Sequence, residues 1–222
     1  MIAEGTRNVT VAVIAKEPVP GLVKTRLCPP CTADDAAAIA GAALLDTIDA
    51  VISGGRRAVV VLDGSPGSWL PTGIEVVPQR GVGLAERLGH AVVDVGGPLV
   101  VVGMDTPQLT RALLDDASAR LMAPGTDAVL GPAEDGGYWC IGLRRPDPGV
   151  FGDVPMSTSD TGVAQLRALD RLGLSVSVLP TLRDVDHFDD ARSVAALVPD
   201  GRFAAAVAAV STRLSDGAAG HR

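Results

Sequence analysis

Aromatic residues are scarce in this chain of 222 residues, where phenylalanine, tryptophan and tyrosine together make up 3%. Valine, alanine and leucine must therefore build the core, and a hydrophobic content of 47% is enough for a sizeable one. Cysteine is also rare, and three cysteines do not make a disulfide framework. Long runs of one charge are absent, which argues against a disordered chain.

The sequence also lacks an apolar stretch long enough to span a bilayer, and its start, MIAEGTRN, lacks the apolar segment of a signal peptide. A pI near 4.9 and a formal net charge of -7 argue against nucleic acid or an anionic membrane as the main partner. One local cluster of cations would still be enough to bind a small anion. We therefore expect a soluble cytoplasmic protein with small-molecule ligands, and the oligomeric state stays open.

Short Val-rich runs alternate with amphipathic segments along the chain. The runs predict strands over 9–15, 57–63, 74–78, 98–105, 127–132, 138–144 and 174–180. The other segments predict helices over 32–52, 84–95, 110–122, 161–173, 188–197 and 201–214. This alternation predicts a single α/β domain over residues 1–214, with a mostly parallel sheet covered by helices on both faces, and a flexible tail over 215–222.

The loop AKEPVPGLVKTRLCPPC, residues 15–31, gathers cations directly after the first predicted strand. Gly21 would let the backbone approach a ligand, and Lys24 and Arg26 supply donors that match phosphate oxygens. The loop is not a Walker A motif, and GVGLAE at 81–86 is not a dinucleotide fingerprint because Glu86 replaces the third glycine. We predict phosphate binding here, and the alternative is a solvated surface pair.

Cys28 and Cys31 close the same loop as a C-x-x-C pair before a predicted helix start, where a thiolate would be stabilised. A redox role is conceivable on this pattern. The alternative is two loop thiols with no chemistry of their own, and no further ligand lies nearby to complete a structural zinc site.

Three aspartates lie at or just after predicted strand ends, where ligands sit in sheets of this kind. Asp105 follows VVVGM, and Asp184 and Asp186 alternate in LRDVD, so that both point to one side of an extended backbone. Carboxylates facing a basic loop suit Mg²⁺ or Mn²⁺ bound to phosphates. The alternative is that these residues cap the helices that follow, and we expect one of Asp184 and Asp186 to cap and the other to bind metal.

Two further loops could contact an acceptor. One is the turn in GPAEDGGYWC, for which a plain turn between strands is an equal alternative, and the other is the hydroxyl-rich VPMSTSDTG, which could merely cap a helix. The candidate acceptor-binding residues are Glu134, Asp135, Gly136, Gly137, Ser157, Thr158 and Ser159.

These motifs resemble a known family over nearly the whole chain. The patterns AKxPxPGxxKTRL, GMDTP, GPAEDGGYWCIGL, STS and LRDVDHFDDA are similar to those of the bacterial DUF2064 family of glycosyltransferase-like proteins. The resemblance implies the nucleotide-diphospho-sugar transferase (GT-A) fold and a relationship to 2-phospholactate guanylyltransferases. It also implies that the Gly21–Arg26 loop binds nucleotide phosphates, that Asp105 and Asp186 bind metal, and that Gln79–Gly83 lies near the base.

The candidate function is a metal-dependent nucleotidyltransferase that uses a nucleoside triphosphate and a small phosphorylated acceptor. The alternatives are a glycosyltransferase with a nucleotide-sugar donor and a nucleotide-binding protein without catalysis. Lys24, Arg26 and Asp105 would be catalytic, and Asp105, Asp184 and Asp186 would hold Mg²⁺ or Mn²⁺. The candidate nucleotide-binding residues are Ala15, Lys16, Gly21, Lys24, Thr25, Arg26, Gln79, Gly81 and Gly83.

Overall fold

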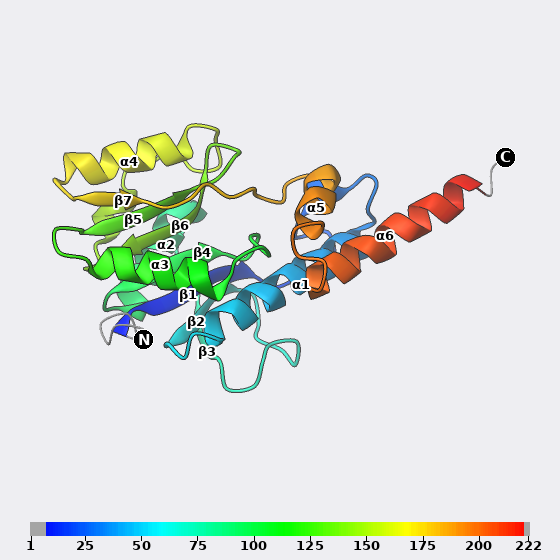
Figure 1. Ribbon diagram of the computed structural model, residues 1–222, viewed down its shortest axis with the longest axis horizontal. Coiled ribbons are helices and arrows are strands. Elements are labelled where there is room, and N and C mark those ends of the chain that lie inside the picture. Colours follow the sequence, from blue (N-terminus) through cyan, green and yellow to red (C-terminus); the bar gives the residue numbers. More distant parts are fainter. Residues whose placement is uncertain (1–7, 220–222) are drawn as a thin grey trace.

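The computed structural model describes residues 8–219, in which one seven-stranded sheet runs in the order β3-β2-β1-β4-β6-β5-β7 (Figure 1). The strands are β1 (Thr10–Lys16), β2 (Ala58–Asp63), β3 (Glu75–Pro78), β4 (Leu99–Gly103), β5 (Ala128–Pro132), β6 (Tyr138–Leu143) and β7 (Val176–Val178). Only β6 runs antiparallel to its neighbours, β4 and β5. The predicted mostly parallel sheet is therefore confirmed.

The helices fall in the segments that the sequence predicted. They are α1 (Ala33–Ile52), α2 (Gly83–Val95), α3 (Arg111–Met122), α4 (Thr161–Arg171), α5 (Phe188–Ala195) and α6 (Arg202–Ala219), with short 3-10 turns η2 (Thr25–Leu27) and η3 (Pro148–Phe151). Thr32 and Thr110 cap α1 and α3 as expected, because each hydroxyl accepts a backbone N–H three residues on. Helix α6 continues five residues past its predicted end, so part of the predicted tail is helical, and residues 220–222 lie outside the described part.

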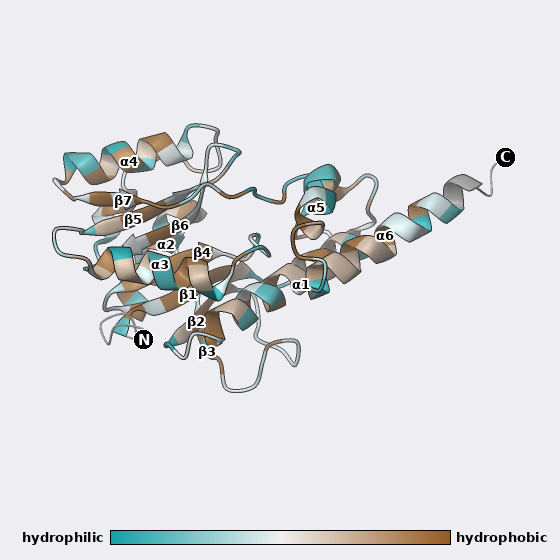
Figure 2. Ribbon diagram, in the orientation of Figure 1, coloured by the Kyte–Doolittle hydropathy of each residue, from teal (hydrophilic) through white to brown (hydrophobic). Residues whose placement is uncertain are grey.

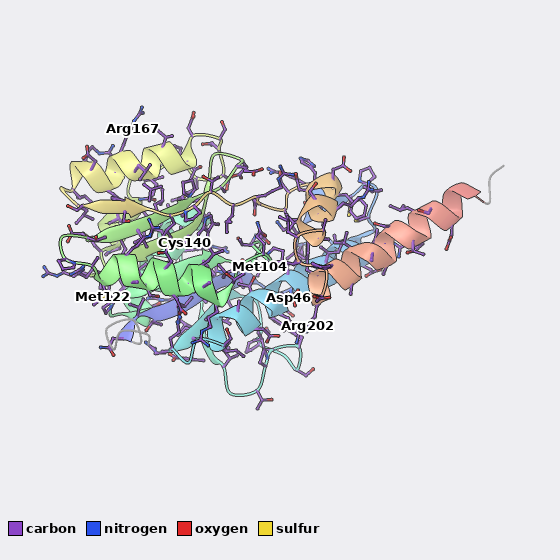
Figure 3. The ribbon with its side chains drawn as sticks, in the orientation of Figure 1. Asp46, Met104, Met122, Cys140, Arg167 and Arg202 are labelled. Carbon is purple, nitrogen blue, oxygen red and sulfur yellow. The ribbon has the colours of Figure 1, made fainter. Side chains whose placement is uncertain are left out.

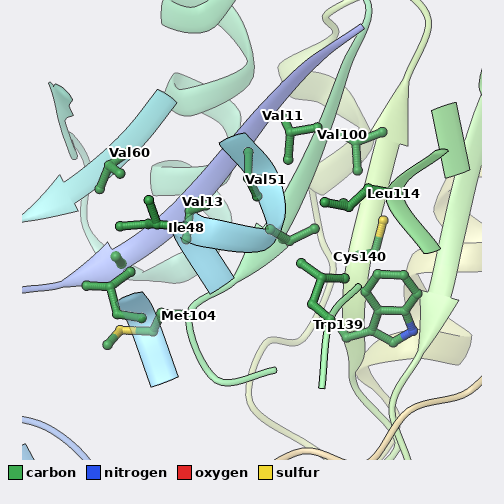
Figure 4. Packing of buried hydrophobic residues seen from close by; sticks show 14 of the residues in the cluster. Val11, Val13, Ile48, Val51, Val60, Val100, Met104, Leu114, Trp139 and Cys140 are labelled. Atoms are coloured by element: carbon green, nitrogen blue, oxygen red, sulfur yellow. The ribbon is translucent and has the colours of Figure 1, made fainter. Parts of the chain in front are cut away.

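Both faces of the sheet are buried under helices. Alternate residues of a strand point to opposite faces, so Val11 and Val13 of β1 pack with Ile48 of α1 on one side (Figure 4). Ala12 packs with Val92 of α2 on the other side. Because central strands such as β1, β2 and β4 are covered twice, both of their faces are apolar, which explains their near-continuous apolar runs in the sequence (Figure 2). The edge strands β3 and β7 are only partly buried.

A smaller third cluster lies beside the sheet, where the first half of α1 meets η2, α5 and α6 (Figure 1). Asp46 of α1 fastens α6 there. Its carboxylate accepts the backbone N–H groups of Arg202 and Phe203 at 3.2 and 2.8 Å, which would otherwise be unpaired donors at the helix start (Figure 3). A residue of one helix thus caps another that is far away in the sequence.

The segment between β7 and α5 joins the sheet to this third cluster (Figure 1). It first follows β5, with Leu179 N–H donating to Leu130 O at 2.8 Å and Leu182 N–H donating to Pro132 O at 3.1 Å. It then crosses to α5, and in doing so it brings residues 184–186 opposite the loop that follows β1.

Candidate active site

A cleft of about 790 Å³ opens at the carboxyl ends of β1 and β4. One wall is made by the ends of β1 and β3 and the start of α2, and the other by the β5–β6 turn and the loop before α4. Residues 184 and 186 and the β1 loop contribute to its rim. The cleft therefore lies where parallel sheets bind their ligands.

The loop after β1 starts with a tight turn. Leu22 N–H donates to Val19 O at 3.0 Å, and Gly21 has a φ of 79° at the position that a type II turn reserves for glycine. Gly21 is exposed and does not line the cleft. Its conformational freedom therefore serves the turn, and the predicted close approach to a ligand gains no support from this position.

Lys24 lies at the centre of the charged residues. Its Nζ lies 2.9 Å from Asp105 Oδ2 and donates to the carbonyl of Val185, and the side chain is only 11% exposed. Burial alone would lower the pKa of Lys24, but the carboxylates of Asp105, Asp184 and Asp186 outweigh it and raise the pKa. Lys24 is therefore a permanent cation inside a group of carboxylates, which rules out the solvated-surface alternative for this residue.

The backbone of Lys24 is also unusual. Its φ of 47° and ψ of 37° are left-handed, a conformation that costs a non-glycine residue roughly 1–2 kcal/mol. From this backbone conformation the side chain reaches both Asp105 and the carbonyl of Val185.

Arg26 and Asp186 form the second ion pair of the site. Arg26 Nη1 lies 2.8 and 3.1 Å from the two carboxylate oxygens of Asp186, and the Arg26 side chain is 67% exposed. Asp184 is deeper. Burial raises its pKa to about 6, and Lys24 limits that rise. The carboxylates thus differ in environment, and each already has a cation nearby.

Asp105, Asp184 and Asp186 do not cap the helices that follow them. Thr110 caps α3, and Asp190 accepts the backbone N–H of His187 at the start of α5 at 2.9 Å. Our expectation that Asp184 or Asp186 would cap α5 is therefore wrong. The sequence did not single out Asp190, because several acids near Phe188 could serve equally well.

The carboxylates fit a hard divalent cation in part. Asp105 Oδ1 is buried without a hydrogen-bond partner, which leaves one oxygen to be satisfied. Within residues 8–219, no three His, Cys, Asp or Glu side chains are grouped tightly enough to hold a metal by themselves. Mg²⁺ usually takes one or two carboxylates and completes its shell with water and phosphates, so the oxygen donors suit such an ion bound together with a nucleotide.

Gln79 braces the wall of the cleft formed by β1 and β3. Its amide nitrogen donates to Ala15 O at 2.7 Å and to Val61 O at 3.0 Å, and its oxygen accepts from Arg87 at 3.3 Å. Arg87 also pairs with Asp63. Since these groups are already occupied, Gln79 ties the carboxyl ends of β1, β2 and β3 together. Arg87 is one of the polar residues lining the cleft that sequence reasoning missed. Arg87 lies one helical turn after Gly83 and therefore on the same face of α2. The prediction that Gly83 binds the nucleotide could have led to Arg87 for that reason.

The opposite wall depends on a close backbone contact. Gly136 has a φ of 89°, and a Cβ there would lie 1.9 Å from the carbonyl oxygen of Ser159. The double glycine therefore packs the β5–β6 turn against the loop before α4. Asp135 accepts the N–H of Gly137 at 2.8 Å, whereas Glu134 forms an ion pair with Arg183 outside the cleft.

The predicted site residues thus divide into two groups. Those that line the cleft are Ala15, Lys16, Arg26, Gln79, Gly83, Asp105, Asp135, Gly137, Ser157, Thr158, Ser159, Asp184 and Asp186. Those that do not line it are Gly21, Lys24, Thr25, Gly81, Glu134 and Gly136. Lys24 and Gly136 still contact lining residues, Asp105 and Ser159 respectively. Tyr138, Trp139 and Met156 line the cleft although they were not predicted to. The roles of all these residues remain predictions.

The two loop cysteines are free thiols that pack with the third cluster. Cys31 is buried, and burial followed by the charge of Asp35 raises its pKa to about 11. A thiol that stays protonated is a poor nucleophile, so the packing alternative is favoured. Among the described helices, none is both long and apolar enough to cross a bilayer.

The sequence matches a family model over residues 40–158, and that family is described as an uncharacterized protein conserved in bacteria (DUF2064). A curated relative, the 2-phospho-L-lactate guanylyltransferase of Haloarcula marismortui, is 32% identical over 126 residues. The alignment covers 56% of this chain and 57% of that protein, so the chain spans little more than half of the relative's length.

Solved structures share the fold. A protein of Desulfovibrio desulfuricans G20, described as a nucleotide-diphospho-sugar transferase, aligns with a TM-score of 0.77 and 26% identity, over 91% of this chain and 98% of that one. Rv0371C of Mycobacterium tuberculosis, solved in complex with manganese, aligns with a TM-score of 0.51 and 24% identity, over 84% and 97% of the two chains. The predicted nucleotide-diphospho-sugar transferase fold is confirmed by these alignments.

Proposed function

The chain belongs to the DUF2064 family of bacterial proteins, and we propose that it is a metal-dependent nucleotidyltransferase acting on a nucleoside triphosphate and a small phosphorylated acceptor. The observation that carries the proposal is the meeting of Lys24 and Arg26 with Asp105, Asp184 and Asp186 at one end of the sheet. Three carboxylates and two cations beside an open cleft are the groups that a metal-bound triphosphate needs.

The reaction would form one bond and break one at the α-phosphorus of the triphosphate. An oxygen of the acceptor phosphate attacks that phosphorus, and the bond to the oxygen that bridges to the β-phosphorus breaks, which releases pyrophosphate. Lys24 and Arg26 would stabilise the charge of the departing pyrophosphate. Asp105, with Asp184 and Asp186, would hold Mg²⁺ or Mn²⁺, an ion that neutralises charge on phosphate oxygens when it is bound.

The two walls of the cleft would divide the substrates between them. The wall made by Ala15, Gln79 and Gly83 would position the nucleoside, because it belongs to the parallel half of the sheet. The hydroxyls of Ser157, Thr158 and Ser159 on the other wall would orient the acceptor. Holding both reactants in line is itself a large part of such catalysis.

Glycosyl transfer from a nucleotide sugar is the second candidate, and the alignment with the nucleotide-diphospho-sugar transferase favours it. The basic loop would then bind the diphosphate of the donor. We favour nucleotidyl transfer because departing pyrophosphate carries more charge than a departing nucleoside diphosphate, and the chain offers two cations for it. A nucleotide-binding protein without catalysis is the third candidate.

Product analysis separates the three candidates. The protein is incubated with nucleoside triphosphates, GTP first because of the guanylyltransferase relative, and with nucleotide sugars, each with phosphorylated acceptors in Mg²⁺ or Mn²⁺. Metal-dependent pyrophosphate release from a triphosphate supports the proposal. Release of a nucleoside diphosphate from a nucleotide sugar, with triphosphates inert, supports glycosyl transfer. Binding without any product supports the third candidate.

A further inference from the structure

Lys24 lies among the three carboxylates to which the proposed function assigns the divalent cation. Its Nζ touches Asp105 Oδ2 at 2.9 Å and the carbonyl of Val185, and both Asp184 and Asp186 act on its charge. An ammonium has three donors, and these contacts use two of them inside the protein. The lysine is therefore bound to the protein's own oxygens, and a phosphate would have to compete with them for it.

Arg26 shows the same arrangement nearer to solvent, because its guanidinium rests on both oxygens of Asp186. The cations suited to phosphate and the carboxylates suited to metal thus neutralise one another. A metal that arrives alone must displace Lys24 or bind beside it, and two cations next to one carboxylate repel each other. A nucleotide that arrives alone must draw Lys24 away from Asp105 and leave that carboxylate unpaired.

We propose that Lys24 is an internal cation that competes with the divalent metal for Asp105, so that metal and nucleotide bind tightly only as a pair. When both bind, the partners are exchanged, with phosphate accepting from Lys24 and the metal taking the carboxylate. Each ligand removes the cost that the other would meet, so by linkage each raises the affinity of the other by the same factor. This inference rests on the proposed metal and nucleotide site.

The lysine content of the chain makes the proposal easy to test. Only two of its 19 basic residues are lysines, Lys16 and Lys24. Lys16 is exposed, lines the cleft together with Lys24's carboxylate partners, and forms no ion pair among the described residues. Lys16→Met therefore removes one lysine charge close to the site without removing the competitor for Asp105.

The test measures binding of Mn²⁺ alone, by loss of the free-ion electron paramagnetic resonance signal, to wild type, Lys24→Met and Lys16→Met. We expect Lys24→Met to bind Mn²⁺ at least tenfold more tightly than wild type, and Lys16→Met to differ from wild type by less than threefold. Adding Asp105→Asn to Lys24→Met should abolish the gain. An equal or weaker affinity of Lys24→Met would overturn the proposal, as would an equal gain in Lys16→Met.

A second measurement uses wild type, in case Lys24→Met does not fold. An amine-acetylating reagent is added at rising Mn²⁺ concentration, and mass spectrometry gives the acetylation of Lys24 relative to Lys16. Displacement from Asp105 should raise that ratio over the range in which Mn²⁺ binds. A constant ratio over that range overturns the exchange.

Failure of this inference differs from failure of the proposed function. If Mn²⁺ binds neither wild type nor Lys24→Met, the competition is refuted, while pyrophosphate release still decides whether the chain is a nucleotidyltransferase. If pyrophosphate is released but Lys24→Met gains no Mn²⁺ affinity, the enzyme stands and the exchange does not.

Discussion

Lys24 and Arg26 belong to one short loop but differ in what surrounds them. The Arg26 side chain is 67% exposed, and an ion pair so open to water contributes about 0–1 kcal/mol to stability. Lys24 is 11% exposed and sits among three carboxylates, so its loss would leave these partly buried charges without their nearest shared cation. Arg26 is thus free to serve a ligand, whereas Lys24 serves the fold as well.

Arg26→Ala should weaken nucleotide binding and leave the melting temperature nearly unchanged. A charge-assisted hydrogen bond to phosphate contributes about 1.5–3 kcal/mol, which is roughly tenfold or more in affinity. Titration calorimetry with the nucleotide identified by product analysis checks this. The matched control is Arg57→Ala, which removes an exposed arginine paired with Glu75 outside the cleft. Equal affinities in both variants would mean that Arg26 is ordinary surface.

Asp105→Asn should remove most of the activity together with the metal dependence of nucleotide binding. The substitution keeps the size of the side chain but removes the charge that a divalent ion needs, and an amide is a weaker ligand. Nucleotide affinity is measured with and without Mn²⁺, alongside Asp116→Asn, which alters an exposed pair on α3. If Asp105→Asn retains the metal dependence of wild type, the metal binds elsewhere.

At the scale of elements, the turn between β5 and β6 and the start of α1 show how local contacts fix the site. The turn can pack closely against the loop before α4 because Gly136 has no side chain. The start of α1 is held by Asp35, which accepts from Thr32 and pairs with Arg213 of α6. The first contact shapes the acceptor wall, and the second joins two helices of the third cluster.

Gly136→Ala should destabilise the protein far more than Gly125→Ala. Both glycines have a left-handed φ, for which a side chain costs roughly 1–2 kcal/mol. Only at Gly136 would the new Cβ also collide with the Ser159 carbonyl, at 1.9 Å, whereas nothing lies within 4 Å of it at Gly125. We expect the collision to add about 1–3 kcal/mol in denaturant titrations. Equal losses in the two variants would show that the loops separate easily.

Asp35→Asn should lower stability at neutral pH by about 1 kcal/mol and make it less sensitive to acid. Burial opposes the charge of Asp35, but the hydrogen bonds from Thr32 and the Arg213 guanidinium outweigh burial and lower its pKa. Its stabilisation is therefore present above the unfolded pKa, near 3.9, and is lost as pH falls through the lower folded value. Urea titrations from pH 7 to pH 3 test this, with Asp34→Asn, a neighbouring acid of the same helix start, as control. Parallel pH curves for wild type and Asp35→Asn would refute it.

At the scale of the whole molecule, the sheet and the third cluster share the site. The segment 179–187 is paired with β5 at one end and enters α5 at the other, and it carries Asp184 and Asp186 between them. The docking of α5 and α6 on α1 therefore sets where these carboxylates lie.

Asp46→Ala should loosen that docking. The substitution leaves two backbone N–H groups at the start of α6 without their acceptor, and we expect a loss of about 1–2 kcal/mol. Nucleotide affinity should also fall, although Asp46 does not line the cleft. Asp49→Ala removes only the carboxylate that lies 2.5 Å from Arg202 Nη1. It should neither lower stability by as much nor weaken nucleotide binding. A stability loss with unchanged nucleotide affinity would show that the carboxylates do not depend on α6.

The elements could be predicted from sequence because their signals are local. Thr32 before an apolar stripe marks the start of α1, and β-branched runs mark the strands. The pairing of Lys24 with Asp105 could not be predicted, since each residue by itself looked like a ligand for something outside the protein. The contact of Gly136 with Ser159 was equally hidden, because D-G-G also reads as an ordinary turn. What local patterns cannot supply is the distance between loops, and that distance decides which charges meet.

The bond from Lys24 to Val185 joins residues 161 positions apart. A ribosome makes the chain from its N-terminus, so the loop with Lys24 leaves it long before residues 184–186 do. Until then, a nascent chain has the basic loop and Asp105 but not the carboxylates that complete the group. The cleft can therefore be assembled only when most of the protein has been made, and a chain that stops before residue 184 would have the sheet strands without a finished binding site.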